Sequence, residues 1–343
     1  MADTHRITFE PVDIEMEVGE DEKILDAAFR QGIHLMHGCR EGQCSACKSY
    51  VLEGEIQMER YSTFACNDAE VADGYVLLCK AHAFSDCTIE LLNFDEDELL
   101  GGVPIRTVTT RIAAIEAVTR DIVSLRLKPA EPFEFKPGQY ADLTIPGTDE
   151  HRSFSMATTQ STPDELEFLI KKYPGGRFSG LLDDGLSVGD ELALTGPYGS
   201  FTLKDGHVLP VVCIGGGAGM APILSLLRHL NEIGSTRPVR FYYGARTAAD
   251  LFYLDAIRQL GANLNGFEFV ACLSESMAGA DGIEVEAGNV TEVVERREPE
   301  LHRSEVYLCG PPPMVDAALT LLEASNVPKD QVFYDKFTSP AAG

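Results

Sequence analysis

Three cysteines within nine residues constrain the fold of this chain more than any other feature. They follow the spacing Cys39-x4-Cys44-x2-Cys47, and 31 residues separate Cys47 from Cys79. Thiols this close can belong to a disulfide framework, a zinc site or a redox cluster. The chain has nine cysteines, an odd number that cannot all pair with one another, and its first residues show no secretory pattern. We therefore expect a cytoplasmic protein and chemistry other than disulfides.

The spacing itself favours a two-iron two-sulfur (2Fe-2S) cluster, because C-x4-C-x2-C with a distant fourth cysteine is the plant-type cluster pattern. Gly38, Gly42 and the small residues before Cys47 let the backbone approach the sulfides. Structural zinc usually needs two close cysteine pairs, and the fourth cysteine here has no close partner. Cys66 and Cys87 compete with Cys79 for the fourth ligand position.

Two histidines flank the cysteine loop, His34 and His37. In a Rieske centre two histidines replace two cysteines on one iron. Four well-spaced cysteines are already present here, so we interpret both histidines as structural.

The charge of the chain is strongly acidic and unevenly spread. The net charge is −26, and residues 1–100 hold 22 acidic against 7 basic side chains, a net of −15. Nucleic acid and anionic membranes are poor partners for such a chain. We expect the first domain to meet a basic surface on another protein.

The pattern along the chain predicts three domains, at residues 1–97, 104–205 and 206–343. Residues 5–18 predict two short strands and residues 21–32 a helix that stops at Gly32, before the acidic segment 93–104 marks a boundary. Residues 105–203 form short strand-like segments separated by turn residues, which suggests a barrel or sandwich. From His207 onward strands alternate with helices, including one expected over 248–261, and this alternation predicts a doubly wound parallel sheet.

One segment, residues 208–227, has no charged side chain and is long enough to span a bilayer. The sequence "GGGAGMAP" interrupts it, so we predict a buried strand, a glycine turn and a helix instead.

A second motif is "HRSFSM" at 151–156. Strand alternation places Arg152, Phe154 and Met156 on one face and the two serines on the other. Downstream, Gly175 and Gly176 precede a helix expected to start near 178 or 179, and a glycine turn at a helix N-terminus binds phosphate. Arg152 could add a bidentate contact to a pyrophosphate.

A third motif is the glycine run from Gly215 to Gly219. It contains G-x-G-x-x, but the third glycine of a dinucleotide fingerprint falls at Met220. The expected strand before it and helix after it supply the required context, and Pro222 suits a first helical turn.

These motifs together resemble the ferredoxin–NADP reductase superfamily, with an N-terminal plant-type ferredoxin domain. The resemblance rests on "VLLC", "RSFS", "PGGRFS", "GPYGSF", "YYGAR" and "LCGPPPMV". It implies a β-grasp 2Fe-2S ferredoxin domain, an antiparallel β-barrel domain and a doubly wound parallel-sheet NAD(H) domain. It favours Cys79 as the fourth ligand, and it favours FAD over FMN because here the ferredoxin precedes the flavin domain. The implied cluster ligands are Cys39, Cys44, Cys47 and Cys79.

The resemblance also implies roles for individual residues. Arg152 binds the flavin pyrophosphate, Phe154 packs on the flavin, Ser155 hydrogen-bonds flavin N5, and Cys309 lies by the nicotinamide. Phe337 covers the flavin ring until nicotinamide displaces it, with Tyr334 as its rival. Ser155, Cys309 and Phe337 are the expected catalytic residues. The expected cofactor-binding residues are Tyr140, Arg152, Ser153, Phe154, Ser155, Ile170, Lys171, Gly175, Gly176, Phe178, Ser179, Gly215, Gly216, Gly217, Gly219, Met220, Pro222, Arg246, Cys309, Gly310, Pro311 and Met314.

Over residues 5 to 340 the chain looks most similar to the reductase components of soluble di-iron monooxygenases of the propane and methane type. This implies an electron path from NADH through FAD and the 2Fe-2S cluster to a di-iron hydroxylase, with a coupling protein as a further partner. Two alternatives stay open: the reductase of a Rieske-type ring-hydroxylating dioxygenase, and a redox sensor or scaffold. Arg246 could meet the 2′-phosphate of NADPH, whereas Asp250 disfavours it, and the relatives mostly use NADH, so we expect NADH.

Overall fold

The chain forms two compact units. The computed structural model describes residues 3–162, 164–204, 206–279 and 284–337. The first unit extends to Arg106 and includes Tyr198–Ser200, and the second comprises Thr107–Pro197 and Phe201–Phe337. The predicted end of the first domain at residue 97 falls inside helix α3 (Glu96–Gly101), whose Leu99 is buried in the core of the first unit. The boundaries of three separate domains stay a prediction.

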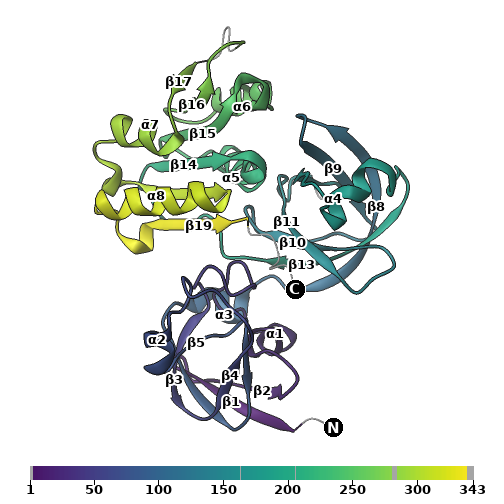
Figure 1. Cartoon of the computed structure of the whole chain (residues 1–343), viewed down its shortest axis with the longest axis vertical. Coiled ribbons are helices and arrows are strands. Elements are labelled where there is room, and N and C mark those ends of the chain that lie inside the picture. The colour runs from purple at the N-terminus through teal and green to yellow at the C-terminus, as the bar shows by residue number, and fades with distance from the viewer. Residues whose placement is uncertain (1–2, 163, 205, 280–283, 338–343) are drawn as a thin grey trace. The chain divides into compact units, whose positions relative to one another are not determined.

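The first unit is built on a five-stranded mixed sheet, with a two-stranded sheet of β4 and β6 and the helices α1, α2 and α3 (Figure 1). The strand order is β2-β1-β7-β3-β5, with β1 and β7 parallel and all other neighbouring pairs antiparallel. Helix α1 buries Ile24, Leu25, Ala27 and Ala28 against β2 and β6, and it ends where Gly32 takes a φ of 76°. This is the predicted β-grasp arrangement. Its elements are β1 (Thr4–Glu10), β2 (Ile14–Gly19), α1 (Ile24–Arg30), β3 (Lys48–Glu53), β4 (Ile56–Met58), α2 (Asp68–Ala72), β5 (Tyr75–Leu77), β6 (Ala81–Ala83), β7 (Cys87–Leu91) and α3.

The second unit begins with a six-stranded barrel. The strand order is β11-β10-β13-β8-β9-β12, and an antiparallel bridge between Met156 and Phe168 joins the two ends of this order. Both bridge residues are fully buried in the barrel core. The predicted barrel is therefore confirmed. Its elements are β8 (Arg106–Ala117), β9 (Ile122–Pro129), β10 (Tyr140–Thr144), β11 (His151–Ser155), β12 (Leu166–Lys171), α4 (Arg177–Asp184) and β13 (Glu191–Tyr198).

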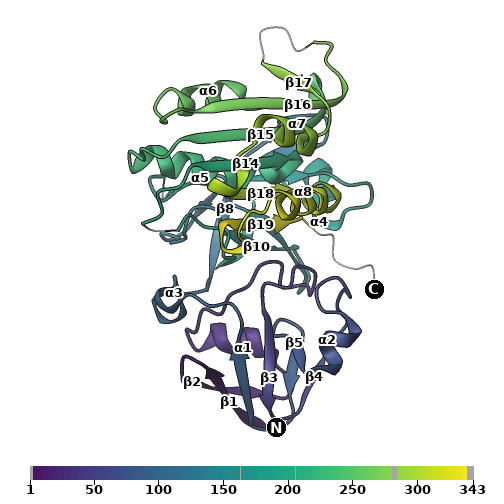
Figure 2. The same cartoon turned by 90° about the vertical axis from the view of Figure 1, so that its left-hand side faces the viewer.

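A six-stranded parallel sheet completes the second unit, in the order β17-β16-β15-β14-β18-β19. Val211 and Cys213 of β14 pack with α5 and α6, whereas Val212 and Ile214 pack with α7 and α8. Figure 2 shows the two helix pairs on opposite sides of the sheet, so the doubly wound prediction is confirmed. Its elements are β14 (Val211–Gly216), η1 (Gly217–Gly219), α5 (Met220–Glu232), β15 (Val239–Thr247), η2 (Ala248–Asp250), α6 (Leu254–Gly261), β16 (Glu268–Ser276), β17 (Val285–Ala287), α7 (Val290–Arg297), η3 (Leu301–Arg303), β18 (Glu305–Gly310), α8 (Pro312–Ala324), η4 (Lys329–Gln331) and β19 (Val332–Lys336).

The apolar segment 208–227 folds as predicted, as β14, the glycine turn η1 and the first part of α5. Across the residues that the structure describes, no helix combines the length and apolar composition needed to cross a bilayer.

The helix expected over 248–261 is wrong in its first half, because α6 begins only at Leu254. Asp250 accepts hydrogen bonds from the backbone and hydroxyl of Thr247, which closes a short turn instead. Tyr253 adopts a left-handed backbone with φ 57°, and its hydroxyl donates to Glu167 on β12 at 2.6 Å. A contact to a distant strand therefore overrides the local helical pattern.

Candidate functional site

The four predicted cluster cysteines converge in the first unit. The thiols of Cys39 and Cys44 lie within hydrogen-bonding reach of each other, and so do those of Cys47 and Cys79. Cys44, Cys47 and Cys79 are buried and Cys39 is half-buried. Two close pairs of thiols suit a 2Fe-2S cluster, in which each iron takes two protein ligands.

Backbone amides of the loop point at these sulfurs. The N–H groups of Glu41 and Gln43 donate to Cys39 Sγ at 3.4 and 3.3 Å, and the N–H of Cys39 donates to Cys44 Sγ at 3.3 Å. The Cys44 thiol and the N–H groups of Gln43 and Glu41 lower the pKa of Cys39 to about 6. They favour the thiolate form that a cluster ligand requires. The loop residues therefore fit a bound cluster.

The rival cysteines lie elsewhere. Cys66 contacts the carbonyl of Tyr75 at 3.8 Å, and Cys87 contacts the carbonyl of Ser85 at 3.2 Å. All nine cysteines are free thiols. Among the described residues, no group of three or more His, Cys, Asp or Glu side chains is arranged to hold a single metal ion.

His37 has a structural role in the first unit. Its Nδ1 donates to the carbonyl of Leu35 at 2.8 Å, and its Nε2 accepts the N–H of Gly199 at 2.8 Å. Burial lowers its pKa to about 3, which keeps the ring neutral so that it can accept this bond. The backbone carbonyl of His37 also accepts the hydroxyl of Ser200 at 2.8 Å. These bonds explain why Tyr198–Ser200 belongs to the first unit.

A serine–aspartate pair lies in the second unit at the predicted flavin strand. β10 and β11 pair so that Tyr140 faces Ser155, and both side chains are buried. Ser155 Oγ donates to Asp335 Oδ2 of β19 at 3.5 Å. Asp335 is not predicted by the sequence patterns, because 180 residues separate it from Ser155. Phe337 follows β19, where its N–H donates to the carbonyl of Gly310 at 3.1 Å.

Two guanidinium groups converge near the N-terminus of α4. Glu150 pairs with Arg152 at 3.4 Å and also with Arg177, a residue of "PGGRFS" to which we had assigned no role. α4 starts at Arg177, slightly earlier than predicted, and Gly176 supplies no side-chain cap. Open N–H groups beside two cations fit a pyrophosphate, which could replace the Glu150 carboxylate.

The other predicted flavin residues surround this strand. Phe154 packs against Phe178 with ring centroids 5.1 Å apart, Ser153 donates to Asp142 at 2.6 Å, and Gly175 has a φ of 72°. The Ser179 hydroxyl accepts the N–H of Tyr173 at 3.4 Å. The side chain of Ile170 lies in the barrel core, so only its backbone could meet a cofactor.

The glycines of the third motif lie at the point where the strand order of the parallel sheet reverses, between β14 and β18. A Cβ atom at Gly219 would lie 2.1 Å from the carbonyl oxygen of Cys309, and one at Gly310 would lie 2.8 Å from that of Gly216. The two strand ends can approach this closely only with glycine at these positions. Dinucleotides bind at such a reversal, outside the carboxyl ends of the strands.

A pocket of about 460 Å³ opens at these strand ends. Asp121 and Asp250 also line it, and Asp121 pairs with Lys171 at 2.6 Å. The Lys171 ammonium therefore contributes to lowering the pKa of Asp121. The predicted binding residues that line the pocket are Lys171, Gly216, Gly217, Arg246, Pro311 and Met314. Met220 and Pro222 are buried in the first turn of α5. Cys309 is fully buried, and this burial raises the pKa of its thiol.

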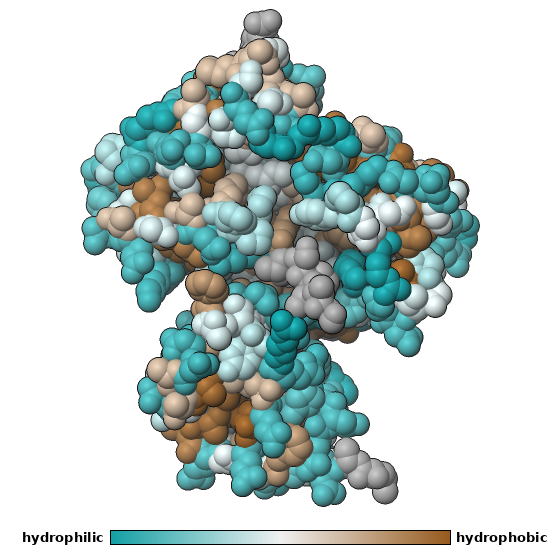
Figure 3. Space-filling model, in the orientation of Figure 1, coloured by the Kyte–Doolittle hydropathy of each residue, from teal (hydrophilic) through white to brown (hydrophobic). Residues whose placement is uncertain are grey.

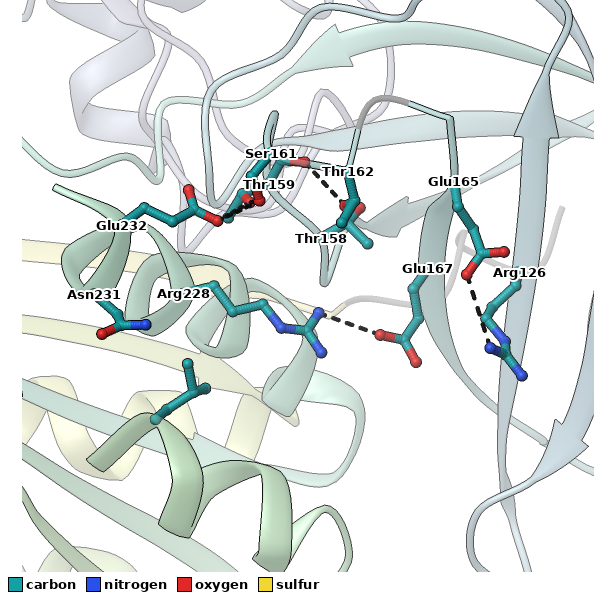
Figure 4. Close-up of a pocket in the computed structure, with 11 residues that line it drawn as sticks. Arg126, Thr158, Thr159, Ser161, Thr162, Glu165, Glu167, Arg228, Asn231 and Glu232 are labelled. Atoms are coloured by element: carbon teal, nitrogen blue, oxygen red, sulfur yellow. Dashed lines mark hydrogen bonds and ion pairs between the residues drawn. The ribbon is translucent and has the colours of Figure 1, made fainter. Parts of the chain in front are cut away.

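A second pocket of about 510 Å³ contains none of the predicted residues (Figure 4). The Glu167 carboxylate on β12 accepts a hydrogen bond from the Arg228 guanidinium of α5 at 3.2 Å. It also accepts hydrogen bonds from the hydroxyls of Ser124 on β9 and Tyr253, at 3.0 and 2.6 Å. This polar network joins the barrel to the parallel sheet, which explains why the two form one unit.

Three family models match successive parts of the chain. They are the 2Fe-2S iron-sulfur cluster binding domain over residues 7–83, the oxidoreductase FAD-binding domain over 109–203 and the oxidoreductase NAD-binding domain over 213–320. The first covers the cysteine quartet, the second the barrel, and the third the glycine turn.

Similar proteins match over nearly the whole chain. The reductase component of propane 2-monooxygenase from Mycolicibacterium goodii is 76% identical, over 99% of each chain. The chain belongs to this family of monooxygenase reductase components. The electron transfer component of toluate 1,2-dioxygenase from Pseudomonas putida is 32% identical over 95% of each chain. The crystal structure of the Amycolatopsis cytochrome P450 reductase GcoB superposes with a TM-score of 0.85 at 29% identity, covering 98% of this chain and all of that one.

The reductase is thus an oxidoreductase with 2Fe-2S, FAD and NAD-binding domains on one chain. The predicted fold class and cofactors are confirmed. The roles of individual site residues stay predictions that the geometry described above supports.

Replacing Ser155 with alanine is expected to slow flavin reduction by NADH about 100-fold, because the predicted hydrogen-bond donor to flavin N5 is lost. Asp335→Asn should slow it about tenfold, since a neutral amide holds the Ser155 hydroxyl less firmly. Stopped-flow absorbance of the flavin measures both rates. Ser161→Ala is the control, because this hydroxyl bonds Glu232 at the second pocket. If flavin reduction were equally fast in Ser155→Ala and wild type, Ser155 would have no role in hydride transfer.

Proposed function

We propose that this reductase takes electrons from NADH and delivers them one at a time to the di-iron hydroxylase of a propane-oxidising monooxygenase. The single observation that carries the proposal is the 76% identity, over essentially the full length, to a propane 2-monooxygenase reductase component. The four convergent thiols fit a 2Fe-2S cluster, and the glycines where the strand order reverses fit a nicotinamide nucleotide. These are cofactors that the proposed electron path needs.

When bound, FAD supplies hydride acceptance and the cluster supplies one-electron transfer, which together convert a two-electron donor into single electrons. Gly216, Gly217 and Met314 would bind the nicotinamide nucleotide at the 460 Å³ pocket. Arg152 and Arg177 would hold the flavin pyrophosphate at the start of α4, where the amide groups have no side-chain cap.

Near the site of hydride transfer, Ser155 would donate its one hydroxyl hydrogen to flavin N5, and Asp335, 3.5 Å from its Oγ, would keep Ser155 in position for that bond. Cys309 would border the nicotinamide, and Phe337 would shield the flavin face from water. In the first unit, Cys39, Cys44, Cys47 and Cys79 would hold the cluster.

The partner of a monooxygenase reductase component is a hydroxylase. We further propose that a small coupling protein belongs to the same system and that the complex works in the cytoplasm, where nine free cysteines persist. The acidic first hundred residues, with a net charge of −15 (7 − 22), favour a basic docking surface on the hydroxylase.

Reconstitution tests this function directly. The reductase is mixed with the di-iron hydroxylase of a propane monooxygenase, and propane oxidation is followed with NADH consumption. We expect hydroxylase-dependent turnover that slows as salt is raised, because exposed charges are screened. Rapid reduction of the cluster by NADH without any hydroxylase turnover would refute the proposed partner.

The Rieske alternative is less well supported, because the toluate dioxygenase component is 32% identical against 76% for the propane monooxygenase reductase. A sensor or scaffold is also disfavoured, because a chain that only reports its redox state needs no nucleotide pocket. If NADH did not drive cytochrome c reduction through this chain, a redox sensor or scaffold would become the better-supported function.

Asp250 supports the preference for NADH over NADPH. It lines the pocket, pairs with Arg120 at 3.4 Å and is bonded to Thr247. Asp250→Asn keeps a hydrogen-bond acceptor but removes the charge that would repel a 2′-phosphate. We expect kcat/KM for NADPH to rise about tenfold, with little change for NADH. Steady-state kinetics with both nucleotides measure this, and a strong NADPH preference in the wild type would contradict it.

A further inference from the structure

One aromatic ring of the first unit is almost completely exposed. Phe64 has 96% of its surface accessible, the largest value among the exposed large apolar residues that the structure describes, and Val208 follows at 81%. Single exposed apolar residues are ordinary on protein surfaces, and Figure 3 shows several apolar areas on one face. The exposure of Phe64 therefore indicates a binding surface only in combination with its fixed backbone and its position beside the cluster loop.

The backbone around Phe64 is fixed by hydrogen bonds. Its N–H donates to Ser62 Oγ at 3.3 Å, and the N–H groups of Ala65 and Cys66 donate to the Ser62 carbonyl at 2.9 and 3.2 Å. Ala65 and Cys66 are buried in the core of the unit. The ring is thus presented on a closed turn, which lowers the entropy lost when a partner binds it.

This turn packs directly on the cluster loop. The N–H of Ser62 donates to the carbonyl of Gly42 at 3.0 Å, and Gly42 lies between ligands Cys39 and Cys44. A Cβ atom at Gly42 would come within 2.9 Å of Tyr61 Cβ, so there is no space between the two segments. A protein that covers Phe64 would therefore lie beside the cluster loop.

Acidic side chains accompany the ring. Glu41 of the cluster loop and Glu59 are about half exposed, and both pair with the nearly buried Lys80, at 3.4 and 3.7 Å. Asp68 is exposed as well, four residues beyond Phe64, while Arg60 is the exposed cation nearest in sequence. An exposed aromatic beside a polar, charged rim is the typical anatomy of an interface hot spot.

We propose that Phe64 is the apolar anchor with which the reductase docks on the hydroxylase, in a pocket bordered by Lys and Arg side chains. The proposal rests on the proposed function and deepens it, because it names the docking surface. A second copy of this chain fits the surface poorly, because the acidic first units of the two copies would repel each other.

Phe64→Ser tests the anchor, with Leu100→Ser as a matched control because Leu100 is an exposed apolar residue of the same unit (70%). Hydroxylase turnover is measured against hydroxylase concentration, and stopped-flow follows cluster reduction by NADH. We expect Phe64→Ser to raise KM for the hydroxylase about 30-fold, the effect of losing a hot spot. Leu100→Ser should change KM less than twofold, Phe64→Tyr should largely restore it, and the rate of cluster reduction should be the same in all variants.

Three outcomes would overturn the anchor while leaving the proposed function intact. They are a KM for Phe64→Ser within twofold of wild type, an equal rise in KM for Leu100→Ser, and a wild-type dimer in sedimentation that Phe64→Ser dissolves. If the wild-type reductase supports no hydroxylase turnover although NADH reduces its cluster, the proposed function itself fails.

Discussion

Replacing Cys44 with serine is expected to abolish electron delivery beyond the flavin. Cys44 is buried, lies within bonding reach of Cys39 and accepts the Cys39 N–H, so no other thiol can replace it without moving the loop. We expect loss of the 2Fe-2S absorbance and EPR signal and a more than 100-fold fall in cytochrome c reduction. NADH-driven reduction of a dye that accepts electrons from the flavin should stay within twofold of wild type.

Cys66→Ser is the matched control for this experiment. Cys66 is a buried thiol of the same unit whose sulfur contacts a backbone carbonyl instead of the quartet. It should retain the cluster and both activities. If Cys66→Ser lost the cluster and Cys44→Ser kept it, the assignment of the four ligands would be wrong.

Replacing Gly219 with alanine is expected to reduce kcat/KM for NADH about 100-fold. The added methyl would lie 2.1 Å from the carbonyl oxygen and 2.6 Å from the carbonyl carbon of Cys309, so backbone must move apart at the ends of β14 and β18. A misplacement of about 1 Å at a binding site can cost 10²-fold in rate. Steady-state kinetics measure the loss, and the 2Fe-2S absorbance shows whether the first unit is intact.

Gly101→Ala controls for the exchange of glycine for alanine itself. A Cβ atom at Gly101 meets nothing within 4 Å, so this variant should behave as wild type or be slightly more stable. If Gly219→Ala used NADH as well as wild type, the close approach of the two strand ends would have no role in nucleotide binding. If it failed to fold, Met314→Ala, which enlarges the pocket without displacing backbone, would test the same nucleotide site.

Several features could be predicted from local sequence alone. The spacing Cys39-x4-Cys44-x2-Cys47 places three thiols on one tight loop wherever that loop lies, because the connecting chain is too short to separate them. Continuous apolar runs such as that of β14, separated by helical patterns, were enough to predict a parallel sheet covered on both faces. The glycines between β14 and α5 predicted the nucleotide-binding turn, because a strand precedes them and a helix follows them.

Other features depend on residues that lie far apart in the chain. Asp335 meets Ser155 across 180 residues, and Arg177 meets Arg152 only through Glu150. The start of α6 was predicted wrongly because the contact of Tyr253 with Glu167 outweighs a helical pattern over 248–253. Local periodicity reports which face of an element is apolar, but it carries no information about such pairings.

For this reductase, the sequence by itself determined the kinds of site, because cysteine spacing and glycine turns are local properties of the chain. Only the tertiary structure decided which side chains complete each site, and it brought Asp335, Arg177 and the Phe64 turn into place. These contacts form when strands and loops from distant parts of the chain pack together, and the packing depends on the whole core.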